Sequence, residues 1–181
     1  HQSSAAINWL MRPVQRIWTH PSADLAFCRL GRVQFIKTGK YLIDRAPQRT
    51  FDAPMLGELV SSFAYPELRG TDPNSIMAEA FAVTHFRVGH VTALFPEGRD
   101  RLILPRPCFQ SSIDVRGGMS GGPVFNSSGQ LCGVNATSFD AEPGAQPVSF
   151  VSLLAPCNEM SLPDDRQERM VPIRELLALG F

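Results

Sequence analysis

The apolar residues of this 181-residue chain occur in short runs interrupted by turn-forming residues, and this pattern limits the fold more than any other feature. The chain contains 14 glycines and 15 prolines, and little of it shows the 3.6-residue apolar spacing of a helix. β-Branched and aromatic segments between turn residues are typical of strands. Many short strands predict an all-β fold, a barrel or a sandwich. The predicted strands are residues 7–11, 14–19, 25–30, 33–38, 56–64, 79–94, 101–105, 122–126, 130–137 and 148–155.

One segment near the end of the sequence does have helical periodicity. Residues 169–180, "RMVPIRELLALG", predict an amphipathic helix that ends at Gly180. Its apolar face is expected to carry Met170, Ile173, Leu176, Leu177 and Leu179.

A polar, proline-containing segment, residues 42–54, separates an early block of strands from a longer later block. We therefore expect a two-lobed antiparallel β-barrel fold with a C-terminal helix. Residues 1–45 form what remains of a first β-barrel, residues 46–160 a second β-barrel and residues 161–181 the helix. Four strands are too few to close a barrel, so the first barrel is expected to be incomplete, with an open sheet edge.

The charge balance excludes two classes of partner. Lysine plus arginine and aspartate plus glutamate each number 17, so no excess charge favours nucleic acid or an anionic membrane surface. No apolar run reaches the roughly 18 residues that a membrane-spanning helix needs.

The four cysteines, Cys28, Cys108, Cys132 and Cys157, are widely spaced and contain no C-x-x-C pair. Cys28 and Cys132 lie inside apolar runs, where a thiol behaves as a small core hydrophobe. The sequence thus leaves free buried thiols or a disulfide pair as alternatives, and we expect neither a metal site nor an organic cofactor.

The densest cluster of small residues is "GGMSGGPVF", residues 117–125. Glycine at position 118 allows a backbone conformation that aims its N–H, with that of Ser120, at one point. Two such donors stabilise an oxyanion as it forms on a carbonyl under attack. The string Ser-Gly-Gly-Pro is expected by chance at about 2 in 100,000 positions. A tight turn leading into a strand is the alternative interpretation.

This segment resembles the nucleophile segment of chymotrypsin-fold serine peptidases, in particular the bacterial trypsin-like and HtrA-like branch with its G-x-S-G-G-P motif. The resemblance extends over about residues 20–155. "HPSADLAFCRL", residues 20–30, is similar to the family segment that carries an orienting aspartate, and Asp24 occupies that position. The weaker matches are residues 57–66, 86–94 and 147–155.

The resemblance implies two barrels with the active site between them, and a polypeptide substrate. Ser120 is then the nucleophile, Asp24 orients a histidine that takes the serine proton, and the N–H groups of Gly118 and Ser120 form the oxyanion hole. The family order along the chain is histidine, aspartate, serine, and Asp24 and Ser120 satisfy its last two positions.

The histidine is the open position in this scheme, because the "T-A-x-H-V" context of the family is not found in the sequence. His1 precedes Asp24 and is the candidate base, while a base supplied from outside this chain remains the alternative. His20 lies on the same approach to Asp24, and His85 and His90 follow Asp24, so these three fit less well.

Three further points concern the substrate preference and the alternatives to a peptidase of this fold. Asp114 lies six residues before Ser120, where trypsin has the aspartate that selects arginine and lysine. The surrounding loop is unlike that of trypsin, and Arg116 is a ready ion-pair partner. We also consider a non-catalytic peptide-binding or scaffold domain of the same fold, and an α/β-hydrolase, which Pro123 disfavours. The chain is expected to lack a PDZ module and to belong to a larger multidomain parent.

Overall fold

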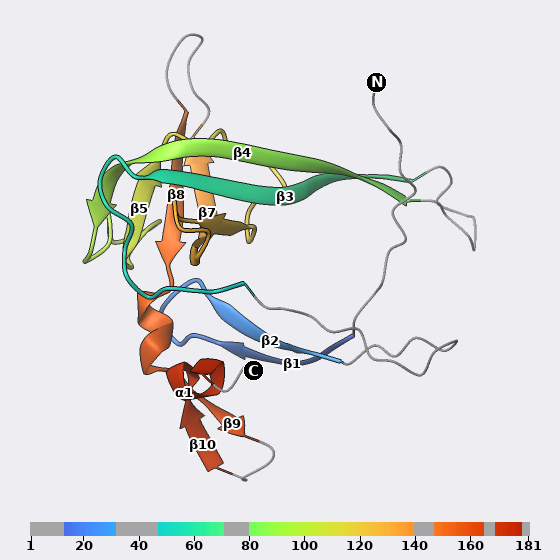
Figure 1. Ribbon diagram of the computed structural model, residues 1–181, viewed down its shortest axis with the longest axis vertical. Coiled ribbons are helices and arrows are strands. Elements are labelled where there is room, and N and C mark those ends of the chain that lie inside the picture. Colours follow the sequence, from blue (N-terminus) through green and yellow to red (C-terminus); the bar gives the residue numbers. More distant parts are fainter. Residues whose placement is uncertain (1–12, 32–46, 71–79, 140–146, 165–168, 179–181) are drawn as a thin grey trace.

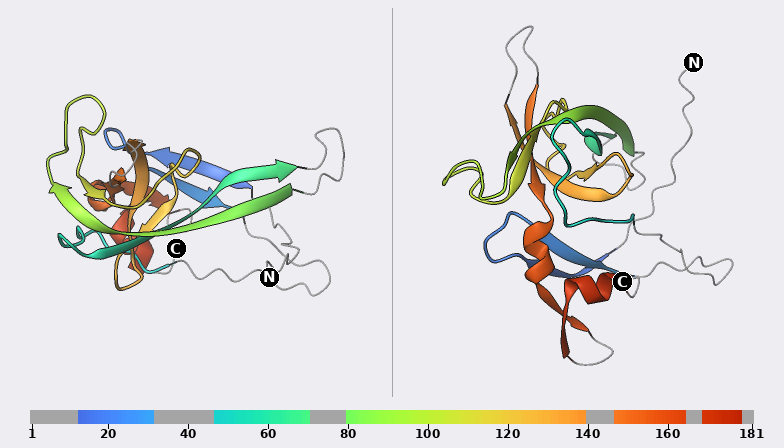
Figure 2. Two further views of the ribbon diagram at one scale, coloured as in Figure 1. Left: turned by 90° about the horizontal axis from the view of Figure 1, so that it is seen from above. Right: turned by 60° about the vertical axis from the view of Figure 1, so that its left-hand side comes forward.

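The computed structural model describes residues 13–31, 47–70, 80–139, 147–164 and 169–178. These residues are arranged in two layers, a barrel and a two-stranded ribbon, with a small hairpin and a helix beyond the ribbon (Figure 1). The right-hand view of Figure 2 shows the same separation of barrel and ribbon. Strands dominate the described residues, which confirms the predicted all-β fold.

The larger layer is a closed barrel in which neighbouring strands pair antiparallel, in the order β3-β4-β5-β8-β7-β6. The barrel closes where β3 pairs with β6, with Ser62 opposite Val124. Its strands are β3 (Leu59–Gly70), β4 (Ala80–Phe95), β5 (Cys108–Ser111), β6 (Pro123–Phe125), β7 (Leu131–Phe139) and β8 (Val148–Leu153).

The barrel encloses one well-packed apolar cluster. Its most deeply buried members come from strands and loops and have no exposed surface: Phe109, Ile113, Met119, Val124, Cys132 and Val151. The connection between β5 and β6 is anchored in the core at three points, Ile113, Val115 and Met119. Residues 116–118, between the last two anchors, are exposed, which positions the glycine-rich segment at the surface.

The smaller layer is the ribbon of β1 (Val14–Thr19) and β2 (Ala26–Leu30), paired with Ile17 opposite Cys28. Trp18 and Phe27, also opposite each other, pack on an apolar cluster of C-terminal residues. The other face is exposed, including Cys28, whose burial in a core was therefore wrongly predicted. Residues 1–45 as a partial first barrel remain a prediction, because 1–12 and 32–46 lie outside the described residues.

The C-terminal part begins with the 3₁₀ helix η1 (Ala155–Glu159) and a hairpin of β9 (Ser161–Asp164) and β10 (Arg169–Pro172). The helix α1 (Ile173–Ala178) follows directly. The predicted helix therefore starts later than expected. Met170 is exposed in β10 opposite Pro163, and Pro172 ends the strand. Proline is tolerated at the start of a helix but not within it, so Pro172 separates strand from helix.

One predicted strand is absent, and three observed strands, β5, β9 and β10, were not predicted. Residues 101–105 form a turn, because the Asp100 carboxylate accepts hydrogen bonds from the N–H groups of Leu102 and Ile103 at 2.9 and 2.7 Å. Such a side chain competes with strand pairing for the backbone donors. The strand lies later, at β5. The predicted strands 7–11 and 33–38 fall outside the described residues.

Candidate active site

The glycine-rich segment forms a loop of residues 116–122, here called the serine loop, between β5 and β6. Gly118 and Gly121 have positive φ angles of 85° and 80°, a region that residues with a Cβ seldom adopt. Between them the side chain of Met119 is fully buried, whereas Ser120 is exposed. The loop thus reverses direction twice, with Met119 in the core and Ser120 presented to solvent.

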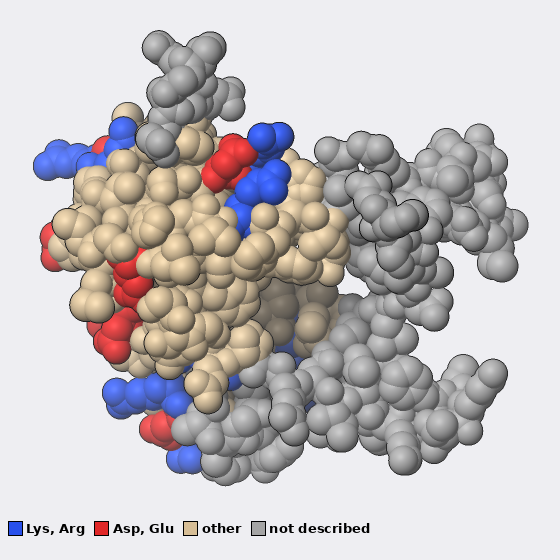
Figure 3. Space-filling view, turned by 45° about the horizontal axis from the view of Figure 1, so that its top comes forward, with Lys and Arg blue, Asp and Glu red and all other residues tan. Residues whose placement is uncertain are grey.

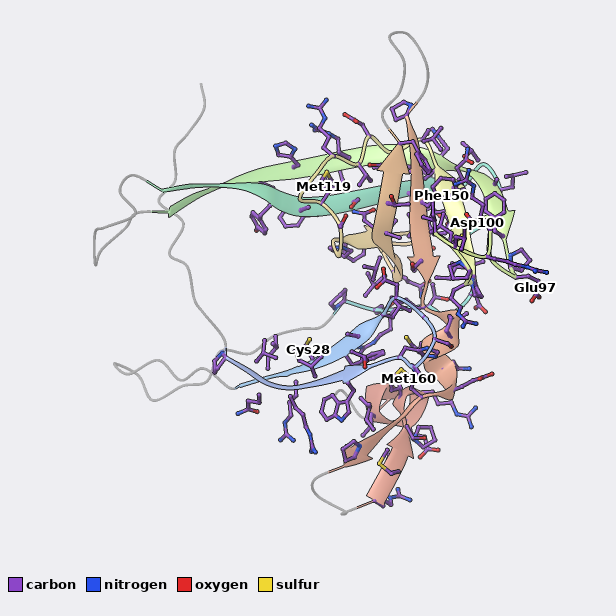
Figure 4. The ribbon with its side chains drawn as sticks, turned by 180° about the vertical axis from the view of Figure 1, so that it is seen from behind. Cys28, Glu97, Asp100, Met119, Phe150 and Met160 are labelled. Carbon is purple, nitrogen blue, oxygen red and sulfur yellow. The ribbon has the colours of Figure 1, made fainter. Side chains whose placement is uncertain are left out.

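Backbone hydrogen bonds attach the serine loop to strand β7. The Gly121 N–H donates to the Asn135 carbonyl, and the Asn135 N–H donates to the Gly122 carbonyl, both at 2.9 Å. Within the loop, the Gly122 N–H donates to the Met119 carbonyl at 3.0 Å. Figure 4 shows Met119 where the loop passes the barrel strands. These bonds fix the backbone on both sides of Ser120.

The reactive groups of Ser120 face outward. Its hydroxyl lies 3.5 Å from the Ala136 carbonyl, at the long limit of a hydrogen bond. Within the described part of the chain, neither the Gly118 N–H nor the Ser120 N–H donates to another protein group. Backbone N–H groups without a protein partner can donate to an anionic oxygen. An oxyanion hole formed by Gly118 and Ser120 stays a prediction.

Asp24 lies in the bend that connects β1 to β2, directly before the buried residue Leu25. Leu25 belongs to an apolar cluster with Leu154 and Cys157, against which Val134 of β7 also packs. The Arg106 guanidinium donates to the carbonyl of Ser22 and ties the same bend to the barrel. The side chain of Asp24 stays exposed.

Strand β7 contacts both the apolar cluster beside Asp24 and the serine loop. Val134 shares a cluster with Leu25, the residue after Asp24, and Ala136 contacts Ser120 two positions further along β7. The β7–β8 register shifts between Asn135 and Thr137, so a bulge lies at this point of the strand. Bulges are frequent beside active sites because they change the direction of side chains.

Three of the candidate histidines, His20, His85 and His90, lie within the described residues. His20 is engaged: its Nε2 lies 3.1 Å from the Pro156 carbonyl, and its Nδ1 accepts from the Ala23 N–H at 2.8 Å. His85 and His90 lie on β4. No histidine of the described ranges hydrogen-bonds to Ser120, and His1 lies outside these ranges.

A cavity of about 520 Å³ adjoins the serine loop. Residues 114–117 line it, together with Ser138 and Phe139 of β7 and Ser149 of β8. Arg116 and Asp114 form an ion pair of 2.8 Å with both side chains partly exposed. The carboxylate of Asp114 is therefore compensated, which agrees with the expectation that trypsin-like selectivity should not be transferred to it.

Three of the four cysteines are buried and do not compete with Ser120 as nucleophiles. All four are free, and Cys108, Cys132 and Cys157 are buried. Burial raises the pKa of the Cys132 thiol to about 12 and that of Cys157 to about 11. Because the thiolate is the reactive form, these buried thiols are inert at neutral pH.

Sequence reasoning missed two buried polar residues at the serine loop, Asn135 and Ser62. The Asn135 Nδ2 donates to the Ser62 hydroxyl at 2.7 Å and to the Met119 carbonyl at 3.3 Å. One signal was available, because an asparagine interrupts the apolar run "LCGVNA" at a position that the barrel buries. Its partner, 73 residues earlier, is brought close only by barrel closure.

A sequence profile of the trypsin-like peptidase domain family matches residues 9–134, more than half of the chain. The chain belongs to this family. It is also 32% identical over 132 residues to a Sinorhizobium fredii (strain NBRC 101917 / NGR234) protein designated uncharacterized protein y4bJ. The match covers 73% of this chain and 17% of that protein, so the trypsin-like chain spans about a sixth of the relative's length.

Among solved structures, chymotrypsin of Cellulomonas bogoriensis is similar, with 19% identity and a TM-score of 0.41. The match covers 81% of this chain and 68% of that one. In the described part of this trypsin-like chain, no helix is long and apolar enough to cross a membrane. The described His, Cys, Asp and Glu side chains form no group of three or more that could hold a metal ion.

Proposed function

We propose that this trypsin-like domain is a serine endopeptidase that hydrolyses peptide bonds, with Ser120 as nucleophile. The observation that carries the proposal is the exposed Ser120 on a loop fixed by Met119 and β7, beside two N–H groups without a partner among the described residues. An exposed serine in an ordinary turn needs neither a buried anchor nor unpaired donors at one point.

In the proposed reaction, the Ser120 hydroxyl attacks the substrate carbonyl while a histidine takes its proton. The N–H groups of Gly118 and Ser120 hydrogen-bond the oxyanion that forms. The histidine then protonates the leaving amine, and water hydrolyses the acyl-enzyme by the same route. Asp24 orients the histidine. We propose His1 as this base, because it precedes Asp24 as the family order requires.

The cavity beside the serine loop is where we propose that the substrate side chain next to the scissile bond is accommodated. Residues 114–117, which line this cavity, precede Ser120 by three to six positions in the chain, and this proximity supports the proposal. Charges of both signs are scattered over the face shown in Figure 3 rather than gathered by sign. The described surface on this face therefore gives no reason to expect that the substrate is a strongly charged peptide.

The test is labelling of the chain with a fluorophosphonate, which phosphonylates an activated serine, followed by peptide mass spectrometry. The expected product carries the label on Ser120, and Ser120→Ala abolishes it. Ser128→Ala, which changes an exposed serine on the β6–β7 turn, is the matched control and keeps the label. His1→Gln should lower the labelling rate by several orders of magnitude, because an unassisted serine is a poor nucleophile. Label that persists in Ser120→Ala would contradict the proposal.

A second candidate function is a non-catalytic domain that binds peptides at the same site. It is favoured by the observation that no histidine in the described ranges hydrogen-bonds to Ser120. This domain would bind peptides equally well with Ser120→Ala and would not react with a fluorophosphonate. Absence of label in wild-type protein that includes its native N-terminal residues would therefore favour binding over catalysis.

A further inference from the structure

A buried asparagine makes side-chain contact with the serine loop. Asn135 of β7 is 2% exposed, and its Nδ2 donates to the Met119 carbonyl at 3.3 Å and to the Ser62 hydroxyl at 2.7 Å. The Ser62 hydroxyl in turn donates to the Pro123 carbonyl at 3.0 Å. The amide of Asn135 thus links the loop before Ser120 to strand β3.

The orientation of this amide follows from its neighbours. The Met119 carbonyl can only accept a hydrogen bond, so the atom that faces it must be the donor Nδ2. The Ser62 hydroxyl uses its proton on Pro123, which leaves a lone pair for the same NH₂ group. The Oδ1 of Asn135 is buried without a partner among the described residues.

The Met119 carbonyl and the Ser120 N–H belong to one peptide group. A trans peptide is planar, so its C=O and N–H point in opposite directions. The Gly122 N–H and the Asn135 Nδ2 hold the carbonyl toward the barrel, at 3.0 and 3.3 Å. The Ser120 N–H is thereby directed away from the barrel, into the space where the proposed oxyanion forms.

We propose that Asn135 is a positioning residue for the oxyanion hole: its side-chain amide fixes the Met119–Ser120 peptide and so aims the Ser120 N–H at the substrate carbonyl. This inference rests on the proposed function. Gly122 supports it, because a Cβ there would lie 3.2 Å from the Asn135 Nδ2 and 2.9 Å from the Met119 carbonyl oxygen. Absence of a side chain at position 122 leaves room for the amide contact.

The first test compares Asn135→Leu, which keeps similar volume without a donor, with Ser62→Ala, which leaves the amide contact to Met119 intact. The substrates are an oxo ester and the thionoester of one acyl amino acid. Sulfur accepts hydrogen bonds weakly, so a thionoester benefits little from the oxyanion donors. For Asn135→Leu we expect kcat on the oxo ester to fall roughly tenfold or more, with KM little changed.

The fall in kcat on the thionoester should be clearly smaller. The ratio of kcat on the oxo ester to kcat on the thionoester therefore falls in Asn135→Leu and stays at the wild-type value in Ser62→Ala. Active-site titration corrects both rates for inactive molecules. A merely structural role would lower the two rates by the same factor. An unchanged ratio in Asn135→Leu, or the same fall in Ser62→Ala, would overturn the inference.

The second test needs no activity. The N–H residual dipolar coupling of Ser120 in ¹⁵N-labelled protein reports the direction of this bond. It should change in Asn135→Leu and not in Ser62→Ala. Asn135→Ala serves in the same measurement if the leucine variant does not fold. An unchanged coupling refutes the positioning role, whereas a failure of wild-type protein to react with a fluorophosphonate refutes the proposed function instead.

Discussion

Alanine substitutions at three glycines of the serine loop distinguish two reasons why a position requires glycine. One is a left-handed backbone conformation, and the other is a lack of space for a side chain. A Cβ added at Gly117 would lie in open space, and the φ angle there is not positive, so alanine meets neither obstacle. Gly121 also has open space but a φ of +80°. At Gly122 the φ is not positive, but the Cβ would lie 2.9 Å from the Met119 carbonyl oxygen. Within one loop, alanine should therefore be tolerated at Gly117, be strained by the backbone conformation at Gly121 and collide with neighbouring atoms at Gly122.

The magnitudes follow from these surroundings. Gly117→Ala should leave stability unchanged or raise it by up to about 1 kcal/mol, because alanine reduces the entropy of the unfolded chain. Gly121→Ala opposes this gain with the about 1–2 kcal/mol that a left-handed conformation costs an L-residue. The net loss there is about 1 kcal/mol, the difference between these two effects.

Gly122→Ala should be the most destabilising of the three. The Cβ would also lie 3.2 Å from the Phe63 carbonyl oxygen and from the Asn135 Nδ2, so two backbone oxygens and a buried amide surround it. These groups cannot move aside as the end of a flexible side chain can. Overpacking of this kind costs about 1–3 kcal/mol, and we expect a value near the upper end of that range.

Urea unfolding followed by fluorescence measures the differences. With a slope of about 2 kcal/mol per molar urea, a loss of about 2 kcal/mol lowers the midpoint by about 1 M. The expected order of midpoints is Gly117→Ala highest, then Gly121→Ala, then Gly122→Ala. A Gly122→Ala midpoint equal to that of Gly117→Ala would refute the close approach on which the geometry of the loop depends.

Three further predictions concern other parts of the molecule. Ellman's reagent at neutral pH should modify one thiol quickly, and Cys28→Ser should remove this phase, because the other three cysteines are buried. The Glu58 carboxylate accepts a hydrogen bond from the Ser127 hydroxyl at 2.6 Å, and this bond with others lowers the pKa of Glu58 below its ordinary value of 4.5. The ionised carboxylate therefore stabilises the folded chain above pH 4.5, and this stabilisation is lost as the pH falls. The urea midpoints of wild type and Glu58→Gln should converge in acid. If the cavity receives the substrate side chain, Arg116→Gln frees the Asp114 carboxylate to bind a substrate arginine. The ratio of kcat/KM for an arginine substrate to kcat/KM for an alanine substrate should then rise about 1.5- to 5-fold, the effect of one exposed ion pair. An unchanged ratio would argue against that use of the cavity.

The fold class followed from local pattern, and the errors have physical causes. In residues 14–19 and 130–137 the apolar side chains alternate or cluster as they do in strands, and these two segments correspond to β1 and β7. Residues 101–105 have the same composition, but the Asp100 carboxylate captures N–H groups among them. The C-terminal periodicity is real, yet Pro172 divides it between a strand and a helix. Competition of this kind is decided by hydrogen bonds that composition does not reveal.

The sequence by itself determined the all-β class and, through the spacing of glycines around Ser120, the family to which the chain belongs. These are local properties, because turn residues and φ angles depend on a few neighbouring positions. Only the tertiary structure decided that Ser62 and Asn135 meet beside the serine loop, and that β7 contacts both this loop and, through Val134, the apolar cluster beside Asp24. Such contacts arise because closing a barrel brings residues distant in sequence into one layer, and no local pattern records which ones.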